Sequence, residues 1–139
     1  IKSIEMENLV NVVAIIQARM GSTRLPGKVM KKIGDLHLIE LMIRRIEKAR
    51  TINSILVATS TDPDDQNIVD FVNSIGFKVV TGSENDVLNR YLKAALEVNA
   101  DVVVRLTGDC PLVDPEVVDD VVNNFKESNA DYSSNINPR

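Results

Sequence analysis

The sequence predicts an α/β protein, a three-layer α/β/α sandwich in which a mostly parallel sheet lies between two layers of helices. Short runs rich in β-branched residues alternate with longer segments of helical periodicity along the 139 residues. Most of these short runs are apolar throughout, as in strands buried on both faces. With 44% hydrophobic residues, the chain is long enough for one domain with its own core, and two domains are not expected.

Four apolar runs are predicted to be strands, and a shorter fifth run follows near the end of the chain. The predicted strands are Val12–Gln17, Ser54–Ser60, Phe77–Thr81, Asp101–Leu106 and Asp131–Ser134. Residues 1–10 precede the first strand and are expected to form an N-terminal extension of a single domain that spans residues 1–139.

Four helices are predicted at residues 38–50, 63–76, 87–98 and from 115 onward. Asp62-Pro63 and Asp114-Pro115 each place a capping carboxylate before a proline, and Gly76 is a stop signal. Helical spacing predicts the inward-facing residues of three helices. They are Leu38, Leu41, Met42 and Ile46; Leu88, Tyr91, Leu92 and Ala95; and Val118, Val121, Val122 and Phe125.

The composition excludes several classes of protein. A net charge of -4 and a pI near 5.0 argue against general binding of nucleic acid. The single cysteine, Cys110, excludes an intramolecular disulfide, and no apolar stretch approaches the roughly 18 residues of a membrane span. The start of the chain lacks the order of a signal peptide, so we expect a cytoplasmic protein without nucleic-acid or membrane partners.

The loop after the first predicted strand carries an unusual local positive charge. Arg19, Arg24 and Lys28 fall there, and no acidic residue occurs from position 8 to 34. Glycines such as Gly21 let backbone amides approach a ligand, and the cations complement phosphate oxygens. Because parallel strands place their carboxyl ends at one edge, this loop lies where ligands bind. A polyphosphate site is predicted, with a surface loop of incidental charges as the alternative.

This loop matches neither of two common nucleotide motifs. Five residues, rather than four, separate Gly21 from Gly27-Lys28, and Val29 stands where a P-loop needs a metal-binding Ser or Thr. The Gly-x-Gly-x-x-Gly fingerprint of dinucleotide-binding proteins is also absent from the sequence. Both the ATPase or GTPase interpretation and the dinucleotide interpretation are therefore weakened.

A second candidate site follows the fourth strand. Asp109 comes just beyond that apolar run, where Gly108 and Pro111 force the chain to turn. Magnesium prefers one or two protein carboxylates together with phosphate oxygens, which suits one Asp beside a triphosphate. The alternative is a turn-forming Gly-Asp pair without a metal.

Three ordered segments resemble the cytidylyltransferase family, of the acylneuraminate cytidylyltransferase and spore coat polysaccharide biosynthesis protein F type. They read QARMGSTRLPGK at 17–28, GSENDVLNRY at 82–91 and LTGDCPLVDP at 106–115, so the resemblance covers the chain from Val12 onward. It implies a Rossmann-like sheet of the nucleotide-diphospho-sugar transferase type. It also implies transfer of CMP from CTP to a sugar or sugar acid, with release of pyrophosphate, in cell-surface or spore-coat polysaccharide biosynthesis.

The resemblance also implies roles for individual residues. Arg19, Lys28 and Asp109 would be catalytic, with Asp109 binding Mg²⁺. The residues expected to bind the nucleotide are Ala18, Arg19, Gly21, Ser22, Arg24, Lys28, Thr59, Asp86 and Arg90. For Asp62 and Asp86, a contact with the base or sugar and a helix cap are alternatives that stay open.

Other polar residues receive structural interpretations. Asp64 and Asp65 are expected to be helix-dipole partners in a first turn, and His37 a surface residue rather than a general base. Cys110 is expected to pack at a turn.

The chain is shorter than family members usually are, so we expect a form that lacks the C-terminal part of the fold. That part is expected to supply a second acidic magnesium ligand, contacts with the acceptor and much of a homodimer interface. The alternative function is therefore a nucleotide-binding module without turnover. A third interpretation is a flavodoxin-like or receiver-type domain with an acidic pocket. The cationic loop after the first strand argues against it.

Overall fold

The computed structural model describes residues 11–21, 30–82, 87–107 and 114–128. Its strands and helices follow in the order β1 (Val12–Gln17), β2 (Lys32–Ile33), β3 (Leu36–His37), α2 (Leu38–Ile46), β4 (Ser54–Ser60), η2 (Pro63–Asp65), α3 (Gln66–Ser74), β5 (Lys78–Gly82), α4 (Val87–Glu97), β6 (Val102–Thr107) and α5 (Pro115–Ser128). In this part of the chain no helix is long and apolar enough to cross a membrane.

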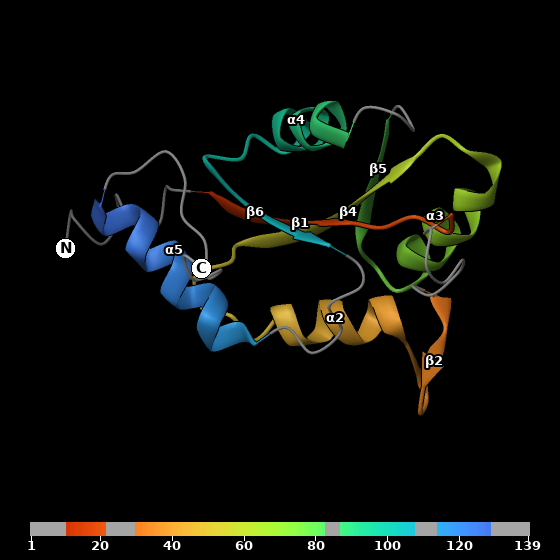
Figure 1. The fold of residues 1–139 in the computed structure, drawn as a ribbon, viewed down its shortest axis with the longest axis horizontal. Helices are drawn as coiled ribbons and strands as arrows, with labels where there is room; N and C mark the ends of the chain where they lie inside the picture. Colours follow the sequence, from red (N-terminus) through yellow and green to blue (C-terminus); the bar gives the residue numbers. More distant parts are fainter. Residues whose placement is uncertain (1–10, 22–29, 83–86, 108–113, 129–139) are drawn as a thin grey trace, which may run out of the picture.

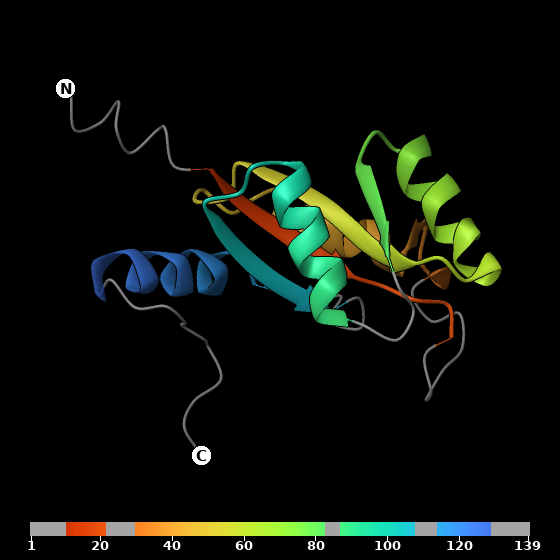
Figure 2. The same ribbon diagram turned by 90° about the horizontal axis from the view of Figure 1, so that it is seen from above.

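The four longer strands form one parallel sheet in the order β5-β4-β1-β6. Helix α4 covers one face of this sheet, and α2 and α5 lie on the other side (Figure 1). Seen from above, α4 lies over the strands of the sheet (Figure 2). The predicted three-layer α/β/α fold with a parallel sheet is therefore confirmed.

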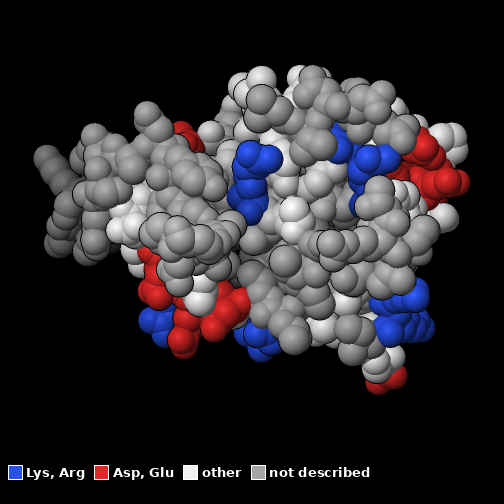
Figure 3. Space-filling view, in the orientation of Figure 1, with Lys and Arg blue, Asp and Glu red and all other residues white. Residues whose placement is uncertain are grey.

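Charged side chains of the described residues lie at several places on one face of the molecule. On the face shown in Figure 3, the Lys and Arg side chains of the described residues lie in several separate groups, and acidic side chains form groups of their own.

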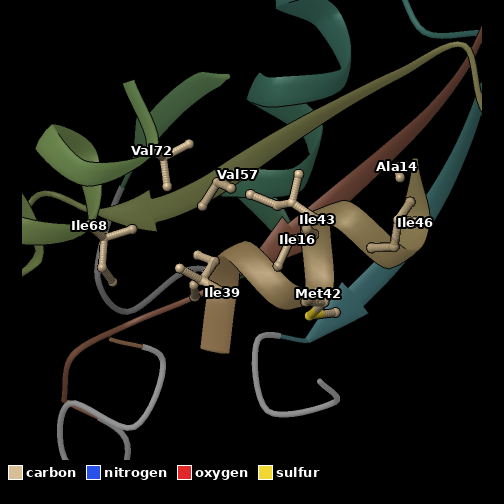
Figure 4. Packing of buried hydrophobic residues seen from close by; sticks show 10 residues of the cluster. Ala14, Ile16, Ile39, Met42, Ile43, Ile46, Val57, Ile68 and Val72 are labelled. Carbon is tan, nitrogen blue, oxygen red and sulfur yellow. The ribbon is translucent and has the colours of Figure 1, made fainter. Parts of the chain in front are cut away.

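The core has two main parts because alternate residues of the strands point to opposite faces of the sheet. On one face, Ile39, Met42 and Ile43 of α2 pack against Ile16 and Val57 of the strands (Figure 4), and the α3 residues Ile68 and Val72 join the same cluster. On the other face, the strand residues Val13, Ile15, Leu56 and Ala58 pack against Tyr91 and Ala94 of α4. Strand β1 is therefore buried from both sides, as its continuous apolar sequence predicts.

The predicted bounds of β1 and β4 are confirmed, and β5 and β6 are each displaced by one residue. Helix α2 ends at Ile46 rather than near residue 50 because the chain tightens there. Lys48 and Ala49 donate to Arg45 and Ile46, three residues back, in place of the helical spacing of four. Pro63 opens the short η2 before α3 begins, and the predicted strand at 131–134 lies outside the described residues.

Four side chains that were predicted to face inward are less buried than expected. Leu92 is 56% exposed, because the buried face of α4 is formed by Tyr91 and Ala94 and Leu92 lies outside it. Leu41 is only half-buried, whereas Ile39 and Ile43 are fully buried on the inner face of α2. Val121 and Phe125 of α5 are likewise half-buried, while Val118 and Val122 are buried as predicted. The side chain of Leu88 lies outside the described set.

His37 is half-buried rather than a surface residue, so that prediction is wrong. It closes the small β2–β3 hairpin, which turns at Gly34 with a φ of 65° and was not predicted because two-residue strands show no periodicity. The His37 Nδ1 lies 2.6 Å from the carbonyl oxygen of Met30. Its ring meets Phe71 of α3 edge-on, with centroids 4.4 Å apart. His37 therefore holds the hairpin against the core.

Asp119 of α5 holds the segment that follows α2. Its Oδ1 accepts hydrogen bonds from the backbone N–H of Thr51 at 2.8 Å and from the Thr51 hydroxyl at 2.6 Å, and its Oδ2 accepts one from Arg50 N at 3.0 Å. Burial, the largest single influence, raises the pKa of Asp119, but the bonds from Thr51 and Arg50 outweigh it, and the net pKa is lowered. The charged form is therefore the one that the fold stabilises.

The substitution Asp119→Asn is expected to destabilise the protein by about 1 kcal/mol near neutral pH, because one carboxylate oxygen acceptor becomes a donor. A lowered carboxyl pKa contributes stability above the unfolded value, and this contribution is lost as the pH falls through the folded value. The difference in melting temperature from the wild type should thus shrink below about pH 4. Asp120→Asn, an exposed neighbour, is the control; an Asp119→Asn deficit of equal size at pH 3 and pH 7 would contradict the prediction.

Candidate active site at the carboxyl edge of the sheet

The candidate site lies where the parallel strands end. In register, Gln17 of β1 pairs with Ala58 of β4 and with Thr107 of β6, so the loops after these strands leave the sheet at one edge. The predicted convergence of the strand ends is therefore confirmed. Ser22, Arg24, Lys28, Asp86 and Asp109 lie outside the described residues.

The described start of the loop after β1 contains three predicted nucleotide-binding residues. Ala18 is 2% exposed, and its N–H donates to Ala58 O at 3.0 Å, which extends the β1–β4 pairing into the loop. The Arg19 side chain is 32% exposed. A Cβ built on Gly21 would lie 3.7 Å from Arg19 Nη2, so the guanidinium lies beside this exposed glycine. A partly exposed cation and an open backbone thus occur together at the binding edge.

A buried carboxylate, Asp65, stands behind this loop. Its Oδ1 accepts the Met20 N–H at 2.7 Å, and its Oδ2 accepts a hydrogen bond from the Ser60 hydroxyl and lies 4.0 Å from Arg19 Nε. Asp65 lies in the first turn of η2, as predicted for a helix-dipole partner, but it is 1% exposed and its carboxylate also contacts the β1 loop, which the sequence did not predict. Asp64, next to it, is exposed as such a partner would be.

Asp62 organises the same connection as a cap. Its Oδ1 accepts the Asp64 N–H at 2.8 Å, and its own N–H donates to Ser60 Oγ at 3.1 Å. The cap predicted at Asp62 is therefore present. Ser60, Asp62 and Asp65 together form a hydrogen-bonded connection between the end of β4 and the loop after β1.

Two further predicted nucleotide-binding residues are buried behind the edge. Thr59 is fully buried, and among the described residues its hydroxyl has no hydrogen-bond partner. Arg90 is 1% exposed. With its amide oxygen facing the guanidinium, Gln17 accepts from Arg90 Nη1 at 3.1 Å and from Nη2 at 2.8 Å. A Cβ on Gly82 would come within 2.7 Å of Arg90 Cγ, so a glycine is required where the two pack. Direct nucleotide contact by Thr59 and Arg90 stays a prediction.

Arg105 of β6 is a cation near this edge that the sequence pattern did not single out. It is exposed, and its guanidinium carbon lies 4.3 Å from the centre of the Tyr91 ring. The Tyr91 hydroxyl donates to Leu106 O at 3.1 Å. Burial raises the pKa of Tyr91 and outweighs the opposing influence of Arg105 and Arg90, so the hydroxyl stays a donor at neutral pH.

A comparison with known protein families identifies the family of this chain. Residues 13–138 match the family model described as Cytidylyltransferase. The chain belongs to the cytidylyltransferase family. Its predicted family and fold type are therefore confirmed, and the family is one of nucleotidyltransferases.

Relatives of this cytidylyltransferase family member include proteins of known name and structure. The spore coat polysaccharide biosynthesis protein SpsF of Bacillus subtilis is 37% identical over 131 residues, which cover 91% of this chain and 55% of that protein. A solved cytidylyltransferase from Leptospira borgpetersenii superposes with a TM-score of 0.80 at 40% identity and covers 85% of this chain and 50% of its own.

A second solved structure is a CMP:2-keto-3-deoxy-manno-octonic acid synthetase complexed with CTP. It superposes with a TM-score of 0.76 at 27% identity over 86% of this chain and 49% of the synthetase. The chain spans about half the length of the curated relatives it matches, namely 52% and 55% of the first two. The expected shortness relative to the family is consistent with these coverages.

Within residues 11–21, 30–82, 87–107 and 114–128, no group of three or more His, Cys, Asp or Glu side chains could hold a metal ion. Asp109, the predicted magnesium ligand of this cytidylyltransferase family member, lies in the segment after β6 and is outside those ranges. Its role as a metal ligand is therefore a proposal.

Proposed function

We propose that this protein transfers CMP from CTP to a sugar or sugar acid and releases pyrophosphate, with Mg²⁺ as cofactor. Cell-surface or coat polysaccharide biosynthesis is the proposed setting, in keeping with the name of the relative from Bacillus subtilis. The observation that carries the proposal is the cationic loop after β1. Arg19 and the open backbone at Gly21 lie at the carboxyl edge of a parallel sheet in a member of the cytidylyltransferase family.

The proposed reaction needs charge stabilisation and orientation rather than a protein nucleophile. A hydroxyl oxygen of the acceptor attacks the α-phosphorus of CTP, forms the new P–O bond and gives up its proton to solvent. The bond between the α-phosphorus and its bridging oxygen breaks, and the electron pair leaves on pyrophosphate. Negative charge grows on the phosphoryl oxygens and the leaving group, which Arg19, Arg24 and Lys28 are positioned in the sequence to offset.

Asp109 is the proposed magnesium ligand, because it directly follows the β6 end of the same edge. Bound magnesium would offset charge on the triphosphate and on the departing pyrophosphate. Ser22 and Asp86 are proposed to contact the nucleotide, as the resemblance of their segments to the family implies.

A binding module without turnover is the second candidate function. The chain covers only about half of its relatives, 52% and 55% of the first two, so its residues need not include the whole catalytic set. Magnesium-dependent release of pyrophosphate in the presence of sugar acids separates the two functions, because a binding module retains CTP unchanged.

Calorimetric titration of the 139-residue chain with CTP, ATP, GTP and UTP, each with and without magnesium, tests the proposed site. Selective CTP binding that magnesium strengthens is the expected result. If no triphosphate binds, the proposed site does not function in this chain. Equal binding of all four would refute selectivity for CTP while leaving a phosphate site.

The substitution Asp109→Asn is expected to abolish the effect of magnesium on CTP affinity, because the amide lacks the charge that holds the cation. The measurement is the same titration with and without the metal. Asp114→Asn is the matched control: Asp114 caps α5 through Glu116 N at 2.8 Å, and asparagine is an equally good cap. An Asp109→Asn variant that keeps the full magnesium response would remove this residue from the metal site.

A further inference from the structure

We propose that Asp65 is a positioning residue for the nucleotide: its buried carboxylate anchors the start of the β1 loop and sets the orientation of Arg19. This inference rests on the proposed function, because it assigns Arg19 to the triphosphate. Asp65 itself contacts no nucleotide in the proposal and acts through Arg19 and the Met20 backbone.

The first argument is the cost of placing this carboxylate inside the protein. Asp65 is 1% exposed, and a buried charge must be compensated by hydrogen bonds or an opposite charge. The compensation comes from two loops that follow neighbouring strands: Met20 N and Arg19 Nε lie after β1, and the Ser60 hydroxyl lies at the end of β4. The residues of this contact are 45 positions apart in the sequence, so Asp65 joins two segments that only the fold brings together.

The second argument is that the carboxylate is not used by its own helix. Asp65 occupies the N-cap position of α3, yet its side chain makes no capping hydrogen bond there. The neighbouring cap is supplied by Asp62, whose Oδ1 accepts from Asp64 N. Both Asp65 oxygens are instead directed at the β1 loop and at Ser60. A residue that served only to start α3 would not need this arrangement.

The third argument concerns Arg19. The carboxylate lies 4.0 Å from Nε on the inner side of the guanidinium, while Nη2 lies beside Gly21 at the exposed side of the loop. The Met20 N–H is hydrogen-bonded to the carboxylate, whereas Arg19 Nε makes no hydrogen bond among the described residues and faces Asp65 as an ion pair at 4.0 Å. The fixed backbone at Met20 and the negative charge behind Nε together favour one orientation of Arg19 before a ligand arrives. Such preorganisation improves binding, because less side-chain entropy is lost when the phosphate contacts form.

The test uses two substitutions at position 65 and one beside it. Asp65→Asn keeps an oxygen for Met20 N and removes the negative charge that faces Arg19, and Asp65→Ala removes both. Asp64→Asn is the matched control, because its carboxylate lies one residue away and is exposed, while the Met20 N–H hydrogen bond and the Arg19 ion pair are made by Asp65. Affinity for CTP with magnesium is measured by calorimetry well below each melting temperature.

We expect Asp65→Asn to weaken CTP binding by about tenfold and Asp64→Asn to leave it unchanged. A double-mutant cycle with Arg19→Ala separates positioning from general stability. In the Arg19→Ala background, Asp65→Asn should alter the affinity by no more than about twofold. An equally large effect in both backgrounds would overturn the proposal, because Asp65 would then act without Arg19.

Hydrogen exchange of the Met20 amide is the second readout and needs no nucleotide. The amide should be protected in the wild type, in Asp64→Asn and in Asp65→Asn, and should exchange much faster in Asp65→Ala. Unchanged protection in Asp65→Ala would overturn the anchoring of the loop. If the wild type binds no CTP, the proposed function fails, and the Met20 exchange still decides whether Asp65 anchors the loop. Should Asp65→Ala not fold, Ser60→Ala weakens the same network while keeping the carboxylate, and partial loss of Met20 protection is expected.

Discussion

Replacing Arg19 with alanine is expected to weaken CTP binding by about 1.5–3 kcal/mol, roughly ten- to a hundredfold in the dissociation constant. The Arg19 side chain is one-third exposed at the carboxyl edge of the sheet, where its guanidinium lies beside Gly21. The variant loses the charge-assisted hydrogen bonds that Arg19 is proposed to make to phosphate oxygens. Among the described residues, Arg19 is the cation that forms an ion pair with the buried Asp65. Calorimetric titration with CTP and magnesium measures the effect.

Lys48→Ala is the control for this prediction. Lys48 is an exposed cation just after α2, next to Ala49, which packs against Val12 at the opposite end of β1. The variant therefore carries the same change in net charge without altering the binding edge. Equal affinities of Arg19→Ala and the wild type would exclude Arg19 from the triphosphate site, and equal losses in both variants would show that only net charge matters.

The substitution Ile43→Ala is expected to cost about 2–5 kcal/mol of folding free energy. Ile43 is fully buried on α2 and belongs to the cluster that includes Ile16, Val57 and Val72 (Figure 4). Truncation leaves a cavity at the interface between the sheet and the helical layer, which the two rigid elements cannot collapse to fill. This loss is a large share of the roughly 5–15 kcal/mol that stabilises a typical domain. Urea unfolding measures it.

Leu96→Ala provides the comparison, because Leu96 is 69% exposed on α4 and a surface substitution usually changes stability by less than about 0.5 kcal/mol. The helix context and the change in side-chain size match those of Ile43→Ala. A small loss for Ile43→Ala, similar to that of Leu96→Ala, would mean that the α2 face is not part of the cooperative core.

Much of the fold follows from local patterns. Strands β1 and β4 have the predicted bounds because their apolar runs are interrupted abruptly by polar or glycine-containing loops. Pro63 and Pro115 mark helix starts, since a proline after a capping aspartate suits a first turn. The prediction of inward-facing side chains from helical spacing was less accurate, because spacing alone does not separate neighbouring residues of one helix. Leu92 is exposed because its neighbour Tyr91 occupies the inward direction of α4.

For the candidate site, too, some features were predictable from the sequence and others were not. Sequence reasoning placed Arg19 and Gly21 at the binding edge, since any loop after a parallel strand must emerge there, and the family match supports the nucleotide chemistry. The family resemblance implies that Arg90 contacts the nucleotide, and this stays a prediction; what the sequence did not predict is that the side chain is buried against Gln17. Burial of a long cation depends on the width of the space beneath α4, which no local pattern reports.

By itself, the sequence determined the parallel α/β architecture, the cationic loop after the first strand and membership of the cytidylyltransferase family. These depend on residue type and spacing along the chain. Only the tertiary structure decided which of two adjacent aspartates matters. Asp64 and Asp65 are chemically identical neighbours, yet a turn of the backbone exposes one and directs the other at Met20 and Arg19. The direction of a side chain at the start of a helix depends on packing between distant segments, and therefore on the completed fold.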